Sequence, residues 1–340
     1  MAVDSIPRRL LEQAKARPNH PAYFVRSASG GWSATDYATY ARQVRQAARA
    51  LIALGMPELG TVSILGFNRP EWVILDIATM MARGAPAGIY TTCSPSEVQY
   101  IIDHSASTVV LVENQNQYNK VQSERDKGNL PKLQWIVLMA GAIKPAGDAM
   151  VLSWDEFLAK GEPRFDQELD ARLAAIEENQ NATFIYTSGT TGPPKAVMLS
   201  TRNLTWTADC ARQLVDVQAG DCSLSYLPLS HIAEQMFTLH VPITVGSQVY
   251  FATSIDKIVE NLKEVRPTVI FGVPRIWEKM HSGVAAKLAT ATGVKKKIAD
   301  FAIRTAKAVH DIQNAGGTVT GVLALKYKLA NKLVYSKVKA

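Results

Sequence analysis

The sequence of 340 residues lacks the features that mark several common protein classes. It has only three cysteines, Cys93, Cys210 and Cys222, and none belongs to a C-x-x-C pair. This disfavours a disulfide framework or a zinc site, so we expect reduced thiols in the core. No run of 18 apolar residues is present, and the N-terminus lacks the layout of a signal peptide. These absences predict a protein that is made and kept in the cytosol.

An excess of positive charge is absent outside the C-terminal end. The net charge is +7, yet residues 287–340 alone hold 11 lysines and arginines against two acidic residues. Apolar residues recur there at roughly helical spacing, at Ile298, Phe301, Thr305, Ala308, Val309 and Ile312, and then at Leu325, Leu329 and Leu333. This pattern is typical of an amphipathic helix and not of a surface that recognises nucleic-acid bases, so we predict no nucleic-acid partner. We favour an ordinary amphipathic helix whose lysine-rich face is exposed to solvent. The alternative is peripheral contact with an anionic membrane surface.

Strand and helix signals alternate along most of the chain, which predicts an α/β protein with mostly parallel sheets. Short apolar runs predict strands at 61–67, 85–90, 108–112 and 135–139, and a second series at 222–227, 248–252 and 268–273. Capping boxes beginning at Ser94 and Ser153 predict helix starts. The polar stretch 174–181 separates the two series. We therefore predict two layered α/β subdomains, residues 1–178 and 179–340. No G-x-G-x-x-G follows a strand, which disfavours a dinucleotide-binding fold.

One segment combines hydroxyls, glycines and a lysine in a way that is typical of a phosphate-binding loop. It reads Y-T-S-G-T-T-G-P-P-K over residues 186–195 and lies between two apolar, strand-like runs. A phosphate anion binds exposed backbone amides, hydroxyl donors and a fixed positive charge. The residues that we expect to bind it are Thr187, Ser188, Gly189, Thr190, Thr191, Gly192 and Lys195.

Two other interpretations fit this segment less well. A polar hairpin turn needs neither four hydroxyls nor so long a loop, because hairpin loops usually have about 2 to 5 residues. A Walker phosphate loop, G-x-x-x-x-G-K-[ST], is followed directly by a helix. Here Lys195 follows two prolines, no Ser or Thr comes after it, and the next residues predict a strand.

The segment resembles the signature of the adenylate-forming superfamily, which includes acyl-CoA synthetases and luciferases, with Ala196 where that signature has glycine. Further segments resemble the long-chain fatty-acyl-CoA synthetases, most of all their bubblegum-type members, and the resemblance covers essentially the whole chain. These segments are V-S-I-L-G-F-N-R-P-E-W (62–72), G-I-Y-T-T (88–92), L-S-T-R-N-L (199–204), Y-L-P-L-S-H-I-A-E-Q (226–235) and F-G-V-P-R-I-W-E-K (271–279).

The resemblance implies a two-step ligase reaction with ATP, Mg²⁺ and coenzyme A. A fatty acid and ATP form acyl-AMP and pyrophosphate, and coenzyme A then displaces AMP to give a thioester. Lys195 and His231 are the implied catalytic residues, and Thr187 is our candidate magnesium ligand. His231 lies at a predicted strand-to-helix junction, where, taken alone, it would be a structural histidine or a helix-start residue. Within its motif, we expect it where the acyl carboxylate meets the nucleotide.

The resemblance also implies segments that this sequence does not contain. They are a Tyr-Gly-x-Thr-Glu motif, a ribose-binding aspartate and a small C-terminal domain with a catalytic lysine. We therefore expect the chain to be the N-terminal portion of a long-chain fatty acid–CoA ligase, truncated before the C-terminal domain and inactive alone. The alternative is a non-catalytic derivative that binds nucleotide, acyl chain or membrane. Acyl chain length and oligomeric state are not predicted.

Overall fold

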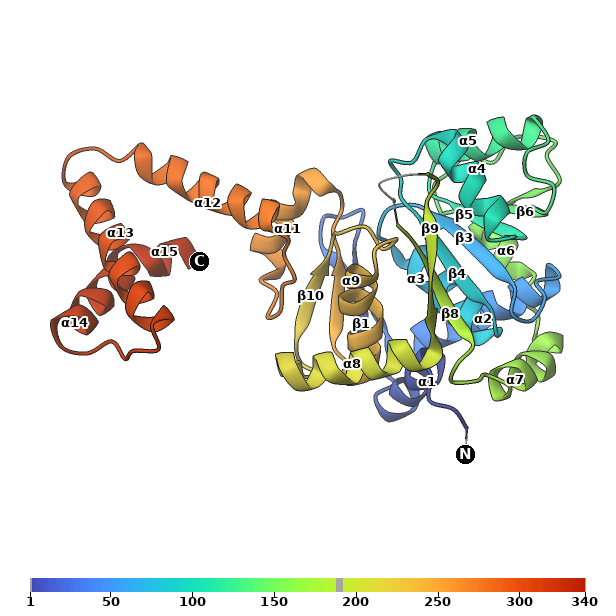
Figure 1. Cartoon of the computed structure of the whole chain (residues 1–340), viewed down its shortest axis with the longest axis horizontal. Helices are drawn as coiled ribbons and strands as arrows, with labels where there is room; N and C mark the ends of the chain where they lie inside the picture. Colours follow the sequence, from blue (N-terminus) through green and yellow to red (C-terminus); the bar gives the residue numbers. More distant parts are fainter. Residues whose placement is uncertain (1, 188–191, 340) are drawn as a thin grey trace. The chain divides into compact units, whose positions relative to one another are not determined.

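The computed structural model describes residues 2–187 and 192–339, with side chains up to residue 337. The chain forms two compact units, Met1–Ile270 and Phe271–Ala340, called unit 1 and unit 2 below. Unit 1 contains every named strand, and unit 2 is helical in its described part. Figure 1 shows the elements of each unit.

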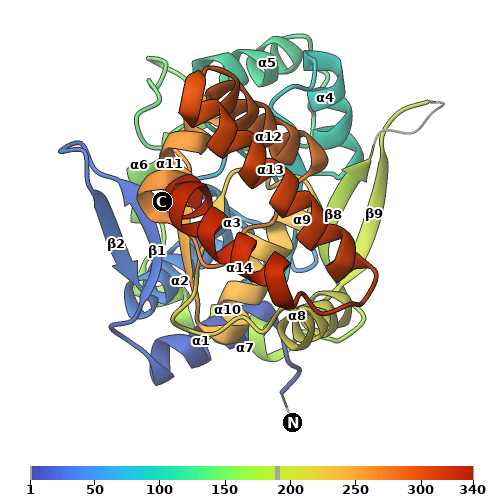
Figure 2. The ribbon, with the colours of Figure 1, turned by 90° about the vertical axis from the view of Figure 1, so that its left-hand side faces the viewer.

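The larger sheet of unit 1 has seven strands, all parallel except the edge strand β9. In spatial order they are β7 (Val151–Ser153), β6 (Trp135–Leu138), β5 (Val109–Val112), β3 (Thr61–Leu65), β4 (Ala85–Ile89), β8 (Asn181–Thr187) and β9 (Lys195–Ser200). β3, β4 and β5 are buried along their whole length, as parallel strands covered on both faces require. Figure 2 shows β8 and β9 as a hairpin at the edge of this sheet.

Two hydrophobic cores cover the two faces of this sheet. The core on one face involves α2 (Tyr37–Ala53), α3 (Pro70–Met81), α6 (Trp154–Ala159) and α7 (Asp166–Ala174), with the 3-10 turn η1 (Pro163–Phe165) between the last two. The core on the other face involves α4 (Pro95–His104) and α5 (Gln115–Asp126). Complete capping boxes open α4 at Ser94 and α6 at Ser153, which confirms both predicted helix starts.

The smaller sheet has the order β10 (Cys222–Ser225), β11 (Gln248–Phe251), β1 (Pro21–Arg26) and β2 (Trp32–Asp36). The remaining helical elements of unit 1 are α1 (Ile6–Ala16), α8 (Thr201–Val215), α9 (Ile232–Gln235), the π-helix η2 (Met236–His240), α10 (Val241–Val245), η3 (Ile255–Lys257) and α11 (Ile258–Val265). The α2 and α3 core continues into this sheet through Val249 and Phe251. The Tyr37 hydroxyl on α2 adds a hydrogen bond of 2.7 Å to the Ser247 carbonyl just before β11.

The grouping of strands differs from the sequence expectation. β8 and β9 were expected in a second subdomain beginning near residue 179, but they pair with β4 and complete the larger sheet. Conversely, β1 and β2 come first in the chain but pair with β11 in the smaller sheet. Strand pairing is non-local, so the sequence order of strand signals does not reveal it. The strand predicted at 268–273 is reduced to one bridge between Val269 and Ser223.

Unit 2 consists of α12 (Pro274–Ala289), α13 (Gly293–Asn314), α14 (Gly321–Ala330), the π-helix η4 (Asn331–Tyr335) and α15 (Ser336–Lys339). α13 turns Ala299, Ala302, Thr305 and Val309 inward, close to the predicted apolar stripe. Among the described residues of both units, no helix combines the length and apolarity of a transmembrane span. The three cysteines are free and half-buried, so they are less enclosed than the core thiols that we expected.

Candidate functional site

The predicted phosphate loop connects two paired strands at the edge of the larger sheet. β8 ends at Thr187 and β9 begins at Lys195, and these two residues face each other in the antiparallel register. Both side chains are exposed, and the Thr187 hydroxyl lies 3.5 Å from the Lys195 carbonyl. Gly192 has a φ of 94°, which favours glycine. The other predicted ligands, Ser188, Gly189, Thr190 and Thr191, lie outside the described residues.

The strand register determines which side chains share a face of the sheet. Gly88 on β4 pairs with Ile185 on β8, so Ile185 and Thr187, two residues on, point to the same face as Gly88. Lys195 is opposite Thr187 and therefore shares this face. Ala196 points to the other face, where it packs on the core of α4 and α5. The family signature has glycine at this position, so Ala196 adds a methyl group. This methyl group points away from the Thr187 face.

A second loop lies on the Thr187 face of the sheet. Residues 226–231, called the His231 loop below, connect β10 to α9. A Cβ atom added at Gly88 would lie only 2.8 Å from the Ser230 Cα, so the loop packs directly on the β4 backbone. Since neighbouring strands lie about 4.8 Å apart, this contact places the His231 loop roughly one strand from β8. The His231 loop thus lies on the face of the larger sheet to which Thr187 and Lys195 point.

His231 is the N-cap residue of α9, at the strand-to-helix junction that the sequence predicted. Its Nδ1 accepts a hydrogen bond of 3.1 Å from the Ala233 backbone N–H, and its side chain is exposed. A neutral imidazole that accepts at Nδ1 carries its proton on Nε2. His231 can therefore offer an Nε2–H donor to an oxygen atom of a bound ligand.

Behind this loop lies a buried acid, Glu234 on α9. Its Oε1 accepts hydrogen bonds from the Thr238 hydroxyl (2.9 Å), the Ser225 hydroxyl (3.0 Å) and the Tyr226 backbone N–H (3.0 Å). Burial raises the pKa of Glu234 to about 7, although these donors oppose the rise. Asn68, which follows β3, donates to the Leu227 carbonyl at 2.7 Å and so joins the loop to the larger sheet.

The sequence analysis missed Gly88, Asn68 and Glu234 as parts of this arrangement. Ligands of open α/β sheets bind outside the carboxyl ends of the strands, and Asn68 follows the carboxyl end of β3. That rule could have identified Asn68 from the predicted strand. The contacts of Gly88 and Glu234 join segments that are far apart in sequence, and no local pattern reports them.

The protein groups on the Thr187 face suit an anionic nucleotide better than a metal cage. Among the described residues, no group of three or more metal-ligating side chains is present. Lys195 is an exposed cation beside the Thr187 hydroxyl. A Mg²⁺ ion held by phosphate oxygens and water needs few protein ligands, so one hydroxyl fits that role.

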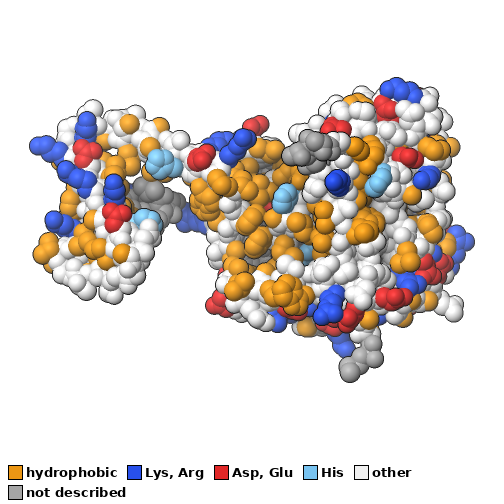
Figure 3. All heavy atoms as spheres, in the orientation of Figure 1, with side chains coloured by type: hydrophobic (Ala, Val, Ile, Leu, Met, Phe, Trp, Pro, Cys, Tyr) orange, Lys and Arg blue, Asp and Glu red, His pale blue; other side chains and the backbone are white. Residues whose placement is uncertain are grey.

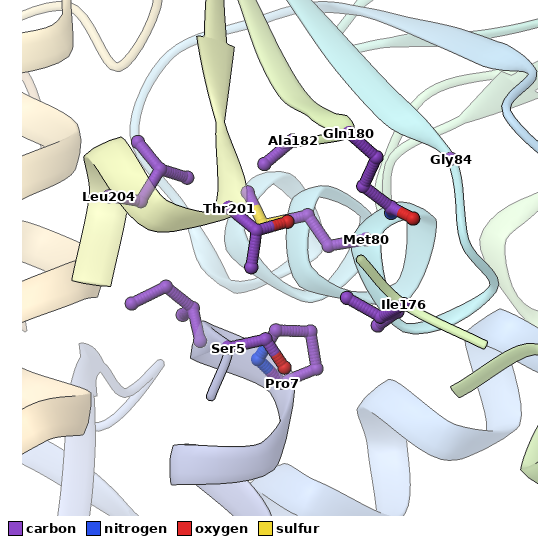
Figure 4. A pocket seen from close by; sticks show the side chains of 10 residues that line it. Ser5, Pro7, Met80, Gly84, Ile176, Gln180, Ala182, Thr201 and Leu204 are labelled. Atoms are coloured by element: carbon purple, nitrogen blue, oxygen red, sulfur yellow. The ribbon is translucent and has the colours of Figure 1, made fainter. Parts of the chain in front are cut away.

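A small cavity lies elsewhere in unit 1 (Figure 4). Gly84 and Gln180, which line it, precede β4 and β8, and Ser5 and Thr201 complete its polar lining. It therefore lies at the amino ends of these strands, whereas Thr187 is the last residue of β8, at its carboxyl end. The cavity is not part of the candidate site.

Comparisons with known proteins identify the family of this chain. Residues 10–326 match the family described as AMP-binding enzyme. The human long-chain-fatty-acid–CoA ligase ACSBG2 is 38% identical over 98% of this chain, and human ACSBG1 is 36% identical over 91%. The chain covers 50% and 42% of these two proteins, so it spans about half the length of the curated relatives it matches.

Solved structures share the fold. The N-terminal domain of FACL13 from Mycobacterium tuberculosis, solved with an inhibitor, superposes with a TM-score of 0.64 at 22% identity. The match covers 82% of this chain and 65% of that one. The match over residues 10–326 and the shared fold lead to one conclusion: the chain belongs to the AMP-binding enzyme family.

Proposed function

We propose that this chain carries the ATP-binding part of a long-chain fatty acid–CoA ligase. The observation that carries the proposal is the common face of Thr187, Lys195 and the His231 loop at the carboxyl ends of β4 and β8. The curated relatives supply the substrate class, because they are named long-chain-fatty-acid–CoA ligases.

The proposed first step joins a fatty acid to AMP. A carboxylate oxygen attacks the α-phosphorus of ATP, and the bond from that phosphorus to the bridging oxygen breaks to release pyrophosphate. Both reactants are anions, so fixed donors and positive charge must reduce their repulsion. Lys195 and the phosphate loop, with Thr187 at its start, would hold the phosphates. His231 would donate its Nε2–H to an oxygen at the reacting centre.

The proposed second step transfers the acyl group to coenzyme A. The thiolate sulfur attacks the acyl carbon, a thioester bond forms, and AMP leaves with the electron pair of the broken acyl–oxygen bond. Coenzyme A is the co-substrate of this step.

The triphosphate of the first step would be bound together with Mg²⁺, which would neutralise part of its charge. Thr187 is the residue proposed to hold this ion.

Binding of MgATP to the purified chain tests the site. Charge-assisted hydrogen bonds to phosphate are worth roughly 1.5 to 3 kcal/mol each, so Lys195→Ala should weaken MgATP binding by about tenfold or more. Lys132→Ala is the matched control, because Lys132 is also exposed but precedes β6, at the other end of the strands. Equal affinity of the two variants in calorimetric titration would contradict the proposed role of Lys195.

A second proposal concerns contact of unit 2 with an anionic membrane surface. α14 exposes Val322 (68%), Leu325 (67%) and Leu329 (51%), whose spacing of three and four residues places them on one face. Lys326 and Lys328 lie beside this stripe, and Figure 3 shows cationic and hydrophobic side chains together on unit 2. This combination is typical of helices that lie in a lipid interface.

Vesicle co-sedimentation distinguishes membrane contact from a helix face that is only exposed to solvent. Each cation near an anionic surface is worth about 1 kcal/mol, and the attraction weakens as the Debye length falls from about 10 Å at 0.1 M salt to 3 Å at 1 M. We expect binding to anionic but not neutral vesicles at low salt, reduced by Leu325→Gln. Equal sedimentation with both lipids, unchanged by salt, would rule out the electrostatic account.

A further inference from the structure

A single buried carboxyl, that of Glu234, joins the segments at the two ends of the His231 loop. Glu234 is 3% exposed, and its Oε1 is within 3.0 Å of donors on three segments. Ser225 ends β10, Tyr226 opens the His231 loop, and Thr238 lies on η2. One side chain thus fixes the beginning of the loop to the helix that follows its end.

Asn68 extends this connection to the larger sheet. Its Nδ2 lies 2.8 Å from the Ser225 Oγ, 2.7 Å from the Leu227 carbonyl and 3.3 Å from the Glu234 Oε1. Because Asn68 follows β3, these contacts join the carboxyl end of the larger sheet to that of β10. Asn68 and Ser225 are both buried, so water does not compete freely for these hydrogen bonds.

The far side of the loop is held by the backbone of β4 and by Gln235. Ser230 packs on Gly88, and the Gln235 Nε2 donates to the Leu229 carbonyl at 2.9 Å. The loop therefore has little room to move toward β4. The His231 loop could still move away from the sheet, but the hydrogen bonds of Glu234 to Ser225 and Tyr226 oppose this movement.

We propose that Glu234 is a positioning residue, which holds the His231 loop on β4 so that His231 faces the ligand bound by the phosphate loop. Glu234 touches neither ligand nor reacting atoms, and it acts through the backbone of residues 226 and 227. The proposal rests on the proposed function, because the ligand facing His231 is the nucleotide and acyl group proposed above. The loop-holding part can be tested without any ligand.

The experiment compares Glu234→Gln with the wild-type chain. Glutamine keeps the size of the side chain but cannot carry a negative charge and has one acceptor oxygen instead of two, so the hydrogen bonds from Ser225, Tyr226 and Thr238 become weaker. Backbone hydrogen exchange should become at least tenfold faster at Tyr226 and Leu227. The ¹⁵N signals of the His231 ring should change from a fixed Nε2–H form toward a mixture of the two tautomers.

Two further variants make this result decisive. Asp76→Asn changes another fully buried acid, on α3, and should leave exchange in the His231 loop unchanged. Thr238→Val removes one donor to the same carboxyl from outside the loop, and should give a smaller increase of about threefold if Glu234→Gln proves too unstable. Wild-type exchange and ring signals in folded Glu234→Gln, or the same change in Asp76→Asn, would overturn the proposal.

Titration with MgATP separates this proposal from the proposed function. We expect Glu234→Gln to bind MgATP about three- to tenfold more weakly than the wild-type chain. A wild-type chain that binds no MgATP contradicts the proposed function, whatever the exchange result. A loosened loop with unchanged MgATP affinity overturns the positioning role, while the proposed function stands.

Discussion

Replacing Gly88 by alanine tests the packing that brings the two loops together. The added Cβ would lie 2.8 Å from the Ser230 Cα, 3.2 Å from the Ser230 Cβ and 3.2 Å from the Trp72 Cζ2. Carbon atoms prefer a separation of about 3.5 to 4.0 Å, so the loop must retreat by most of an ångström. Trp72 is fully buried and cannot move aside.

We expect Gly88→Ala to lower the free energy of unfolding by about 1 to 3 kcal/mol, the usual cost of overpacking. Urea denaturation measures this change. MgATP affinity should fall as well, because the His231 loop moves away from Thr187. Gly220→Ala is the matched control, because no atom outside its own neighbours lies within 4 Å of the added Cβ and the φ of Gly220 is not left-handed.

The reasoning is refuted if Gly88→Ala and Gly220→Ala have the same stability and the same MgATP affinity. A stability loss without an affinity loss would refute only the link between the loop and the site. A loss of both in Gly88→Ala alone is the predicted outcome.

Two further predictions concern stability away from the site. Burial raises the pKa of Asp76, so the unfolded chain binds fewer protons there, and wild-type stability falls as pH rises above the ordinary aspartate pKa of about 4. Asp76→Asn should remove this loss, so it should raise the free energy of unfolding, measured by urea denaturation, more at pH 8 than at pH 5. Asp256 is exposed, and Asp256→Asn should show no such difference between the two pH values. Gly283 lies inside α12 with free space around its Cβ position, so Gly283→Ala should stabilise this helix by up to about 1 kcal/mol. Slower hydrogen exchange over residues 274–289 would confirm this, and unchanged exchange would contradict it.

Local patterns in the sequence predicted most of the strands and the two helix starts with capping boxes. The strand signals were reliable because buried parallel strands are short, continuous apolar runs, as in β3 and β5. The same signals could not show that β1 pairs with β11 or that β8 joins β4, because pairing depends on contacts between distant segments. The predicted division at residue 178 assumed that neighbours in sequence are neighbours in space.

The candidate site shows the same limit. The chemistry that the residue types of the phosphate loop predict stays a prediction, whereas the predicted position of His231 at a helix start is confirmed. The common face of Thr187, Lys195 and Gly88 follows only from the strand register. No local pattern indicates the role of Glu234, because its hydrogen-bond partner Asn68 is 166 residues away in the sequence.

A crystal structure of the chain with a non-hydrolysable acyl-adenylate analogue, and a second with MgATP, would test the central claim most directly. We predict triphosphate oxygens within hydrogen-bond distance of the Lys195 Nζ, on the face of the larger sheet that Thr187 and Gly88 share. The His231 Nε2 should contact an oxygen of the acyl-adenylate on that same face. A nucleotide bound on the Ala196 face, or at the amino ends of the strands near Gly84, would contradict the account.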